Sequence, residues 1–334
     1  MKKIIIVALI IITVTTAGFG AWYFLTSRNS YGGKTASISI AAIPYEKNAL
    51  IYIADDQNFF AANGLDVTFR DYDTGVAAVE AMMAGKIDIA AASEFVVVGR
   101  SLKNHKVRIF ASIAKTQDDY VFGRTDKGIH NVSDLKGKRI GLAKQTAAEF
   151  YLGRFLDRQG MNIQQVKLVD VSPAKSAEMF TDGNLDAIVA WQPYAYRIRK
   201  QEANKIVSWS AQNGQLMYWN LVATDAWISG NPELMKRLLK SLAQAERYLM
   251  LHPSEAKAIV QRRLGYDDAC ITAIWPDTQF TMSLDQSLVV AMEDEARWLI
   301  ANNLTREKKI PNYLDYIHQN GLSEVRSEAV NIIR

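Results

Sequence analysis

The 334-residue chain contains few of the side chains on which metal centres and most active sites depend. Its single cysteine, Cys270, excludes both an internal disulfide framework and a thiolate metal cluster. The four histidines, His105, His130, His252 and His318, include no pair at the spacing of a metal site. A Gly-x-Ser-x-Gly elbow, a P-loop and a dinucleotide fingerprint are also absent. We therefore expect no catalytic residues, no bound metal and no cofactor.

The chain also lacks a strong charge of either sign. Its formal net charge is +4, from 39 basic and 35 acidic side chains. Residues 1–33 contain Lys2, Lys3 and Arg28 and no acid, so removing these three charges from +4 leaves +1 for the rest. Nucleic-acid binding needs a basic surface, and so we expect no nucleic-acid partner.

The one long apolar run lies at the N-terminus. Residues 4–25 carry no charge and follow Met1-Lys2-Lys3. A run of about 20 apolar residues can cross a bilayer, whereas the apolar core of a cleaved signal is usually about 7–15 residues long. Small residues precede possible cleavage sites after Ala17 and Gly20, so a cleaved signal stays an alternative to an anchor. Residues 1–27 are therefore a signal peptide or an inner-membrane anchor, and the body is periplasmic or otherwise extracytoplasmic.

After a polar linker at 28–36, the chain repeats one strand–helix–strand–helix–strand pattern. The first copy has strands at 37–43, 65–72 and 87–92 and helices at 48–62 and 74–84. The second copy has strands at 138–143, 166–171 and 186–191 and helices at 145–159 and 173–181. Gly85 and Asp88 recur 98 residues later as Gly183 and Asp186, and we expect both acids to fix the turn before a strand. Two such units predict two similar α/β lobes.

Extended stretches at 107–114, 119–123 and 217–224 would carry the chain between the lobes. The residues after 224 have helical patterns, and the apolar spacing over 232–251 predicts an amphipathic helix that packs on the first lobe. The predicted organisation is a discontinuous lobe 1 at 37–118 and 222–334, with lobe 2 at 119–221.

Four motifs resemble the periplasmic substrate-binding proteins of ABC importers for nitrate, sulfonates, taurine and thiamine precursors, the NMT1/THI5-like family. In chain order they are Asn63-Gly64-Leu65-Asp66-Val67 after Phe59-Phe60, then 84–90, 134–141 and 182–193. The resemblance covers about 38–298 and implies the type II periplasmic-binding-protein fold, an α/β fold whose two lobes close on a ligand in a cleft. Two departures leave the ligand open: Trp191-Gln192-Pro193 replaces the frequent Trp-Glu-Pro, and Ala143-Lys144-Gln145-Thr146 replaces a Gly-Ser or Gly-Thr turn.

The resemblance implies an extracytoplasmic receptor for a small, anionic or zwitterionic organic solute, of the sulfonate, taurine or nitrate kind. Its partners would be ABC permease and ATPase subunits, with membrane contact through the N-terminal segment, and we expect a monomer. Two alternatives remain: a membrane-tethered sensing subunit, and a pyrimidine- or menaquinone-pathway enzyme on the same fold. The cysteine-rich iron motif of the pyrimidine enzymes is absent, and a cytoplasmic enzyme has no need of residues 4–25.

In open parallel sheets, ligands lie beyond the carboxyl ends of the strands, where helix N-termini attract anions. Four strand-to-helix junctions are therefore the expected site, with aromatic residues nearby as pocket walls. The candidate ligand-binding residues are Tyr45, Ser93, Glu94, Phe95, Lys144, Gln145, Thr146, Trp191, Gln192, Tyr194, Tyr218 and Asn220.

Several of these residues have an equally simple structural role. Ser93 and Thr146 are good N-caps whether or not a ligand is present. Glu94 either stabilises the start of its helix or, if it faces the cleft, binds an amine on the ligand. Lys144 is either a solvated loop lysine or a ligand contact.

Overall fold

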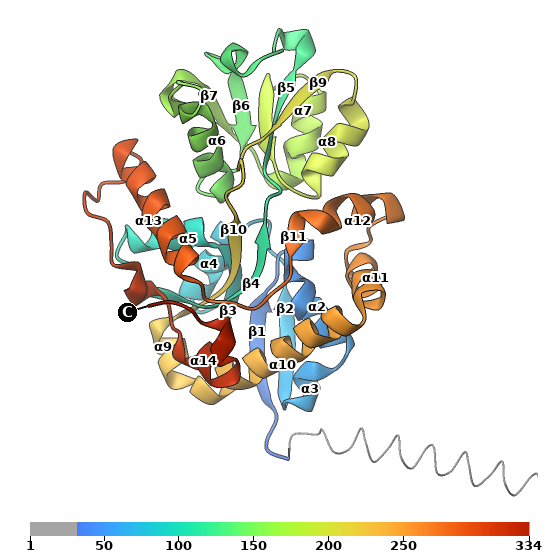
Figure 1. Cartoon of the computed structure of the whole chain (residues 1–334), viewed down its shortest axis with the longest axis vertical. Coiled ribbons are helices and arrows are strands. Elements are labelled where there is room, and N and C mark those ends of the chain that lie inside the picture. The colour runs from blue at the N-terminus through green and yellow to red at the C-terminus, as the bar shows by residue number, and fades with distance from the viewer. Residues whose placement is uncertain (1–31, 334) are drawn as a thin grey trace, which may run out of the picture.

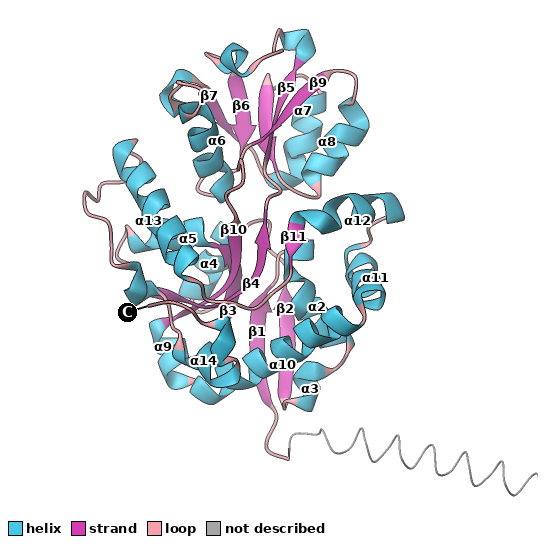
Figure 2. Cartoon of the chain, viewed as in Figure 1, coloured by secondary structure: helices cyan, strands magenta, loops and turns pink. Residues whose placement is uncertain are grey.

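The computed structural model describes residues 32–333, so the predicted signal or anchor segment and the first linker residues lie outside the described part. The chain forms two lobes, which are stacked along the long axis of the molecule and joined by two crossings of the chain (Figure 1). Helices flank the strands in both lobes (Figure 2). Among residues 32–333, no helix combines the length and apolar character needed to cross a membrane.

Each lobe contains one mixed sheet. The lobe 1 sheet has the order β11-β4-β10-β3-β1-β2, with β1 Ala36–Ala41, β2 Leu65–Arg70, β3 Ile89–Ser93, β4 Val107–Thr116, β10 Met217–Thr224 and β11 Thr278–Gln279. The lobe 2 sheet has the order β7-β6-β8-β5-β9, with β5 Tyr120–Arg124, β6 Arg139–Leu142, β7 Lys167–Asp170, β8 Ala187–Ala190 and β9 Ile206–Ser210. The chain crosses between lobes from β4 to β5 and from β9 to β10. The predicted boundary at 221/222 falls within β10.

The repeated sequence pattern folds into repeated local structure. In both lobes the first strand of the repeat pairs in parallel with the second and the third. The Asp88 carboxylate accepts the backbone N–H of Ser39 at 2.8 Å, and the Asp186 carboxylate accepts that of Arg139 at 2.8 Å. Both acids therefore join the turn before one strand to its parallel neighbour, which is the structural role expected for them.

The helices of the repeats agree with the predicted pattern except at one break. Lobe 1 contains α2 Ala49–Asp56, α3 Phe59–Ala62, α4 Gly75–Met83 and α5 Glu94–Ser101, and lobe 2 contains α6 Ala147–Asp157, α7 Ser176–Thr181 and α8 Tyr194–Glu202. The single helix predicted at 48–62 is wrong, because Asn58 takes a left-handed φ of 56° that separates α2 from α3. The N-cap of α4 is Thr74, whose Oγ1 accepts the N–H of Ala77 at 3.2 Å.

The C-terminal part is mostly helical, as expected, and covers lobe 1. Its helices are α9 Asp225–Gly230, α10 Pro232–Leu251, α11 Pro253–Leu264, α12 Asp268–Ile274, α13 Gln286–Ala301 and α14 Asn320–Val325. Helix α10 has the predicted bounds and packs on α2 and α3, where Ser241 Oγ donates to the carbonyl of Phe59 at 3.1 Å. The short edge strand β11 was not predicted.

Apolar packing also joins the two lobes. The ring of Phe150 in α6 of lobe 2 stacks on Phe95 of α5 at 6.0 Å and meets Trp298 of α13 edge-on at 5.6 Å. Gly153 makes this approach possible, because a Cβ at that position would lie 2.0 Å from the Trp298 ring. These contacts place the N-termini of α5 and α6 at the same boundary between the lobes.

Candidate functional site

A cavity lies where the two lobes meet. Its empty volume is about 410 Å³, part of which opens to solvent. The lining residues come from both lobes and from the crossing between them: Tyr45, Lys47, Thr74, Gly75, Ser93, Val96, Asp119, Thr146, Ala147, Ala148, Trp191, Met217 and Trp219.

Three helices begin at this cavity. The cavity is lined by their N-cap residues, which are Thr74 for α4, Ser93 for α5 and Thr146 for α6. The first-turn N–H groups of an α-helix have no intrahelical acceptor and carry a partial positive charge. Three such ends, two from lobe 1 and one from lobe 2, make this cavity suitable for an acidic ligand group.

The hydroxyl groups at these helix starts are not used as side-chain caps at α5 and α6. Ser93 makes no capping hydrogen bond, and Thr146 Oγ1 donates instead to the carbonyl of Ala143 at 2.7 Å. Both residues occupy the N-cap position, but neither side chain accepts a capping hydrogen bond. Their roles as ligand contacts stay predictions.

Aromatic rings form one wall of the cavity. The ring of Tyr45 lies 6.3 Å from Trp191, 6.2 Å from Trp219 and 6.2 Å from Tyr194. The Trp219 indole donates to Asn48 Oδ1 at 2.8 Å. Burial raises the pKa of Tyr45, so its hydroxyl stays neutral. Aromatic walls with a few polar groups are typical of small-molecule sites.

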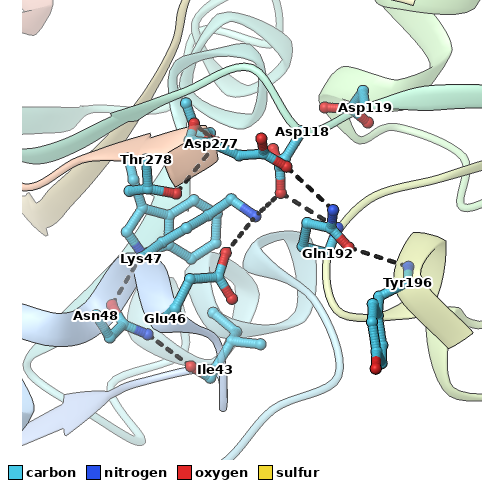
Figure 3. A network of polar contacts seen from close by, with 12 residues as sticks. Ile43, Glu46, Lys47, Asn48, Asp118, Asp119, Gln192, Tyr196, Asp277 and Thr278 are labelled. Atoms are coloured by element: carbon cyan, nitrogen blue, oxygen red, sulfur yellow. Dashed lines mark hydrogen bonds and ion pairs between the residues drawn. The ribbon is translucent and has the colours of Figure 1, made fainter. Parts of the chain in front are cut away.

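A buried ionic network lies beside this wall (Figure 3). Lys47 forms a close ion pair with Asp118 and lies 3.6 Å from a carboxylate oxygen of Glu46. Burial alone would lower the pKa of Lys47, but the charges of Asp118 and Glu46 outweigh it and raise that pKa above its ordinary value. Burial raises the pKa of Glu46 to about 7, against the opposing charge of Lys47. Lys47 is thus a charged group whose own partners already neutralise it.

Gln192 joins the lobes within the same network. Its backbone N–H donates to Asp118 Oδ2 at 3.2 Å, and its Nε2 donates to Asp277 Oδ2 at 3.0 Å (Figure 3). Its Oε1 accepts the N–H of Tyr196 in α8 at 3.0 Å. Asp277 directly precedes β11 of lobe 1, so the glutamine connects α8 of lobe 2 to the opposite lobe.

Asp119 is the acid that lines the cavity. It is 2% exposed, its backbone N–H donates to Gln212 Oε1 at 2.9 Å, and its backbone carbonyl accepts the N–H of Ala211 at 2.9 Å. Its buried Oδ1 has no partner among residues 32–333, and no dashed line reaches it in Figure 3. Burial, and then the charge of Asp118, raises the pKa of Asp119 to about 8.

Glu94, by contrast, does not line the cavity. It is completely buried, and its Oε2 accepts the N–H of Tyr218 at 3.0 Å. Burial raises its pKa to about 8. Glu94, which was to bind an amine only if it faced the cleft, therefore lies behind the wall, and Asp119 lines the cavity instead.

The structure brings four of the twelve candidates to the cavity: Tyr45, Ser93, Thr146 and Trp191. Tyr194 packs behind the aromatic wall, and Gln192 lies in the ionic network. Lys144, Gln145 and Phe95 line a second, wider depression between α5, α6 and the end of α13. Tyr218 donates to Ser287 at 2.6 Å, and Asn220 accepts from Ser112 at 2.7 Å, both within lobe 1.

Several cavity residues were not among the candidates, and the sequence contained a signal for two of them. Thr74 follows a predicted strand and caps a predicted helix, which is the same junction pattern used for the other sites. Lys47 lies two residues beyond the candidate Tyr45. No sequence pattern distinguishes Asp119 or Met217, because their positions depend on how the crossings are arranged. Among residues 32–333, no three His, Cys, Asp or Glu side chains converge closely enough to hold a metal ion.

The chain is similar to known proteins in both sequence and fold. The family model described as "NMT1/THI5 like" matches residues 46–256. The taurine-binding periplasmic protein of Escherichia coli (strain K12) is 25% identical over 245 residues, which cover 69% of this chain and 74% of that protein.

Two solved structures illustrate the range of proteins with this fold. The alkanesulfonate-binding protein SsuA from Xanthomonas axonopodis pv. citri, bound to MOPS, has a TM-score of 0.74 and 16% identity, covering 86% of this chain and 100% of that chain. The desulfurization enzyme DSZB has a TM-score of 0.64 and 15% identity, covering 87% and 99%. At these identities the structural likeness shows the fold alone, and it confirms the expected two-lobed α/β architecture.

Proposed function

Because the chain belongs to the NMT1/THI5-like family, we propose that it is an extracytoplasmic receptor that delivers a small organic acid to an ABC importer. The ligand occupies the cavity between the lobes, with its acidic group at the starts of α4, α5 and α6. Closure of the lobes on the ligand produces the form that docks on the permease.

The convergence of three helix N-termini from two lobes supports this proposal most directly. Thr74 and Ser93 belong to lobe 1 and Thr146 to lobe 2, so a ligand anion between them contacts both lobes. A ligand that contacts both lobes stabilises the closed form relative to an open one, by its difference in affinity for the two. The relatives named for taurine and alkanesulfonate binding agree with an acidic ligand.

Isothermal titration calorimetry of the full chain tests the proposal. The panel comprises alkanesulfonates, 2-aminoethanesulfonate, nitrate, aromatic carboxylates and pyrimidines. We expect at least one ligand to bind with 1:1 stoichiometry. Trp191→Ala should weaken that ligand at least tenfold, a change of about 1.4 kcal/mol, because a cavity wall is lost. Trp275→Ala removes an aromatic residue that packs on Phe280 outside the cavity and should leave affinity unchanged. Silence of the whole panel would contradict the proposed function.

The output of binding is tested separately. Co-purification from membranes with a permease and an ATPase supports transport, whereas a histidine kinase in their place supports sensing. Because the enzyme DSZB has the same fold, a test for chemical conversion is also needed. The bound ligand should be recovered after incubation and its mass measured by mass spectrometry. Recovery of the unchanged ligand agrees with a receptor, and a product of different mass would indicate an enzyme.

A further inference from the structure

The carboxyl group of Asp119 faces a cavity whose helix N-termini favour an anion. Its Oδ1 is buried and has no partner among the described residues. An ionised Asp119 would repel a simple anion, and a protonated Asp119 would leave its acceptor oxygen unused. Burying a polar group without a partner costs free energy. An unpaired carboxyl at a ligand cavity therefore indicates that the ligand supplies its hydrogen-bonding partner.

Further unpaired groups lie behind Asp119. Glu94 Oε1 and both carboxylate oxygens of Glu295 are buried without partners among residues 32–333. They belong to α5 and α13, both in lobe 1. The Asp119 charge helps to raise the pKa of Glu94, and the charges of Glu94, Glu295 and Asp119 add to the effect of burial in raising that of Tyr151 in α6. Glu94 and Tyr151 are therefore within electrostatic range of Asp119.

Among the residues that the structure describes, the cavity lining offers no free cation to this acidic group. Lys47 lines the cavity, but Asp118 and Glu46 already surround its ammonium group. The remaining wall is aromatic, with Tyr45, Trp191 and Trp219, and a cation is stabilised over such ring faces. Because the acids do not converge in a metal-binding arrangement, an organic cation fits this side of the cavity better than a metal ion.

We propose that Asp119 binds a cationic amino group on the same solute whose acidic group lies at the helix N-termini, so that the receptor selects zwitterions over simple anions. This inference rests on the proposed function and adds the feature that discriminates among organic acids. The carboxylate of Asp119 forms a charge-assisted hydrogen bond with the ammonium group, and the aromatic wall contacts the carbon adjacent to it.

Binding of the ammonium group also has a pH signature. The groups within electrostatic range of Asp119 are Asp118 in the same segment, Lys47, Glu94 of α5 and Tyr151 of α6. In the free protein the pKa of Asp119 is about 8, so at lower pH a cation must displace its proton. Affinity for an amine-bearing ligand should therefore rise between pH 6 and pH 8, by up to about tenfold per pH unit.

Calorimetry on matched ligand pairs tests the inference. The pairs are 2-aminoethanesulfonate with ethanesulfonate, and 4-aminobutyrate with butyrate, each titrated into the full chain at pH 7 in two buffers of different ionisation enthalpy. We expect the amine-bearing member of at least one pair to bind at least tenfold more tightly, with release of close to one proton. Asp119→Asn should abolish both the preference and the proton release.

The variant should fold, because Asn has the shape of the protonated carboxyl and Asp119 Oδ1 has no partner to lose; thermal denaturation checks this. Asp182→Asn makes the same chemical change at an exposed position in lobe 2 and should keep the preference. Equal affinity within both pairs, or a preference that persists in Asp119→Asn, overturns the inference and leaves the proposed function intact. Binding only to amine-free acids would likewise overturn the inference and leave the proposed function intact. If no ligand of the entire panel binds, the proposed function and this inference are both overturned.

Discussion

At the scale of single residues, burial distinguishes Lys47 from the surface lysines. Its side chain is 1% exposed, and its partner Asp118 is completely buried. Lys200 and Asp267 also form an ion pair, but their side chains are 61% and 58% exposed. Exposed pairs contribute little because water solvates both charges, whereas removing one member of a buried pair leaves an uncompensated charge in a region of low polarity.

Lys47→Met should therefore lower the free energy of unfolding by about 3–5 kcal/mol. The reason is that Asp118 and Glu46 lose the one described cation that pairs with them, and equilibrium urea denaturation measures the loss. Lys200→Met is the matched control and should leave the denaturation midpoint unchanged. Equal losses in the two variants would mean that the buried network does not stabilise the fold.

The buried carboxyl groups also predict how stability depends on pH. Burial raises the pKa of Glu46 to about 7 and those of Glu94 and Asp119 to about 8, above the ordinary values of 4.5, 4.5 and 3.8. Between about pH 5 and pH 8 the folded state therefore binds more protons than the unfolded state, and stability falls as pH rises.

Glu94→Gln should lower by one the number of protons that the folded state binds in excess of the unfolded state. The free energy of unfolding should therefore fall less steeply with pH, by about 1.4 kcal/mol per pH unit. The amide oxygen can still accept the N–H of Tyr218, so the fold is kept. Urea titrations at several pH values between 5 and 8 provide the measurement. Asp182→Asn should show the wild-type slope, and an unchanged slope in Glu94→Gln would show that Glu94 is ionised in the folded protein.

At the scale of elements, the contact between α6 and α13 is one of those that join the lobes. It depends on the absence of a side chain at Gly153, where the indole of Trp298 occupies the space of a Cβ. Helix interiors usually disfavour glycine by about 0.5–1 kcal/mol relative to alanine, so its presence here reflects packing and not helix stability.

Gly153→Ala should destabilise the protein by about 1–3 kcal/mol, because Trp298 must move away from α6. Gly99→Ala is a matched control in α5, where a Cβ meets no described atom within 4 Å. That variant should gain up to about 1 kcal/mol from helix propensity. Thermal denaturation of both variants gives the comparison, and two changes of the same sign would rule out this account of the α6–α13 contact.

At the scale of the whole molecule, the relation between the lobes depends on two chain crossings and on a few side-chain bonds. Gln192 supplies one of them, because its amide connects the segment before α8 to Asp277 of lobe 1. This bond is partly buried and joins the lobes beside the cavity, so we expect it to favour the closed form and not to stabilise either sheet.

Gln192→Ala should shift the balance between closed and open forms by about 1 kcal/mol, roughly fivefold, since one interlobe hydrogen bond is lost. Small-angle X-ray scattering should show a larger radius of gyration with unchanged circular dichroism. Gln201→Ala, an exposed position in α8, should leave both measurements as in the wild type. An unchanged radius of gyration in Gln192→Ala would show that this bond does not hold the lobes together.

The sequence predicted the parts of the fold that depend on local patterns. The recurrence of Gly85 and Asp88 at Gly183 and Asp186 was enough to predict two α/β units, and the apolar spacing of α10 predicted its bounds. The break at Asn58 was missed because a left-handed asparagine inside an apolar pattern has no signature of its own. Strand β11 has two residues, too few for any periodicity.

The sequence by itself determined the two lobes, the family and the starts of helices that face the cavity, because helix caps, strand alternation and turn residues act over a few neighbouring positions. Only the tertiary structure decided that Asp119 faces the cavity while Glu94 lies behind it, and that Lys47 is neutralised by its neighbours. The orientation of a buried charge depends on distant segments that pack around it. In this molecule those segments are the crossings between lobes and the helices α6 and α13, whose arrangement no local pattern records.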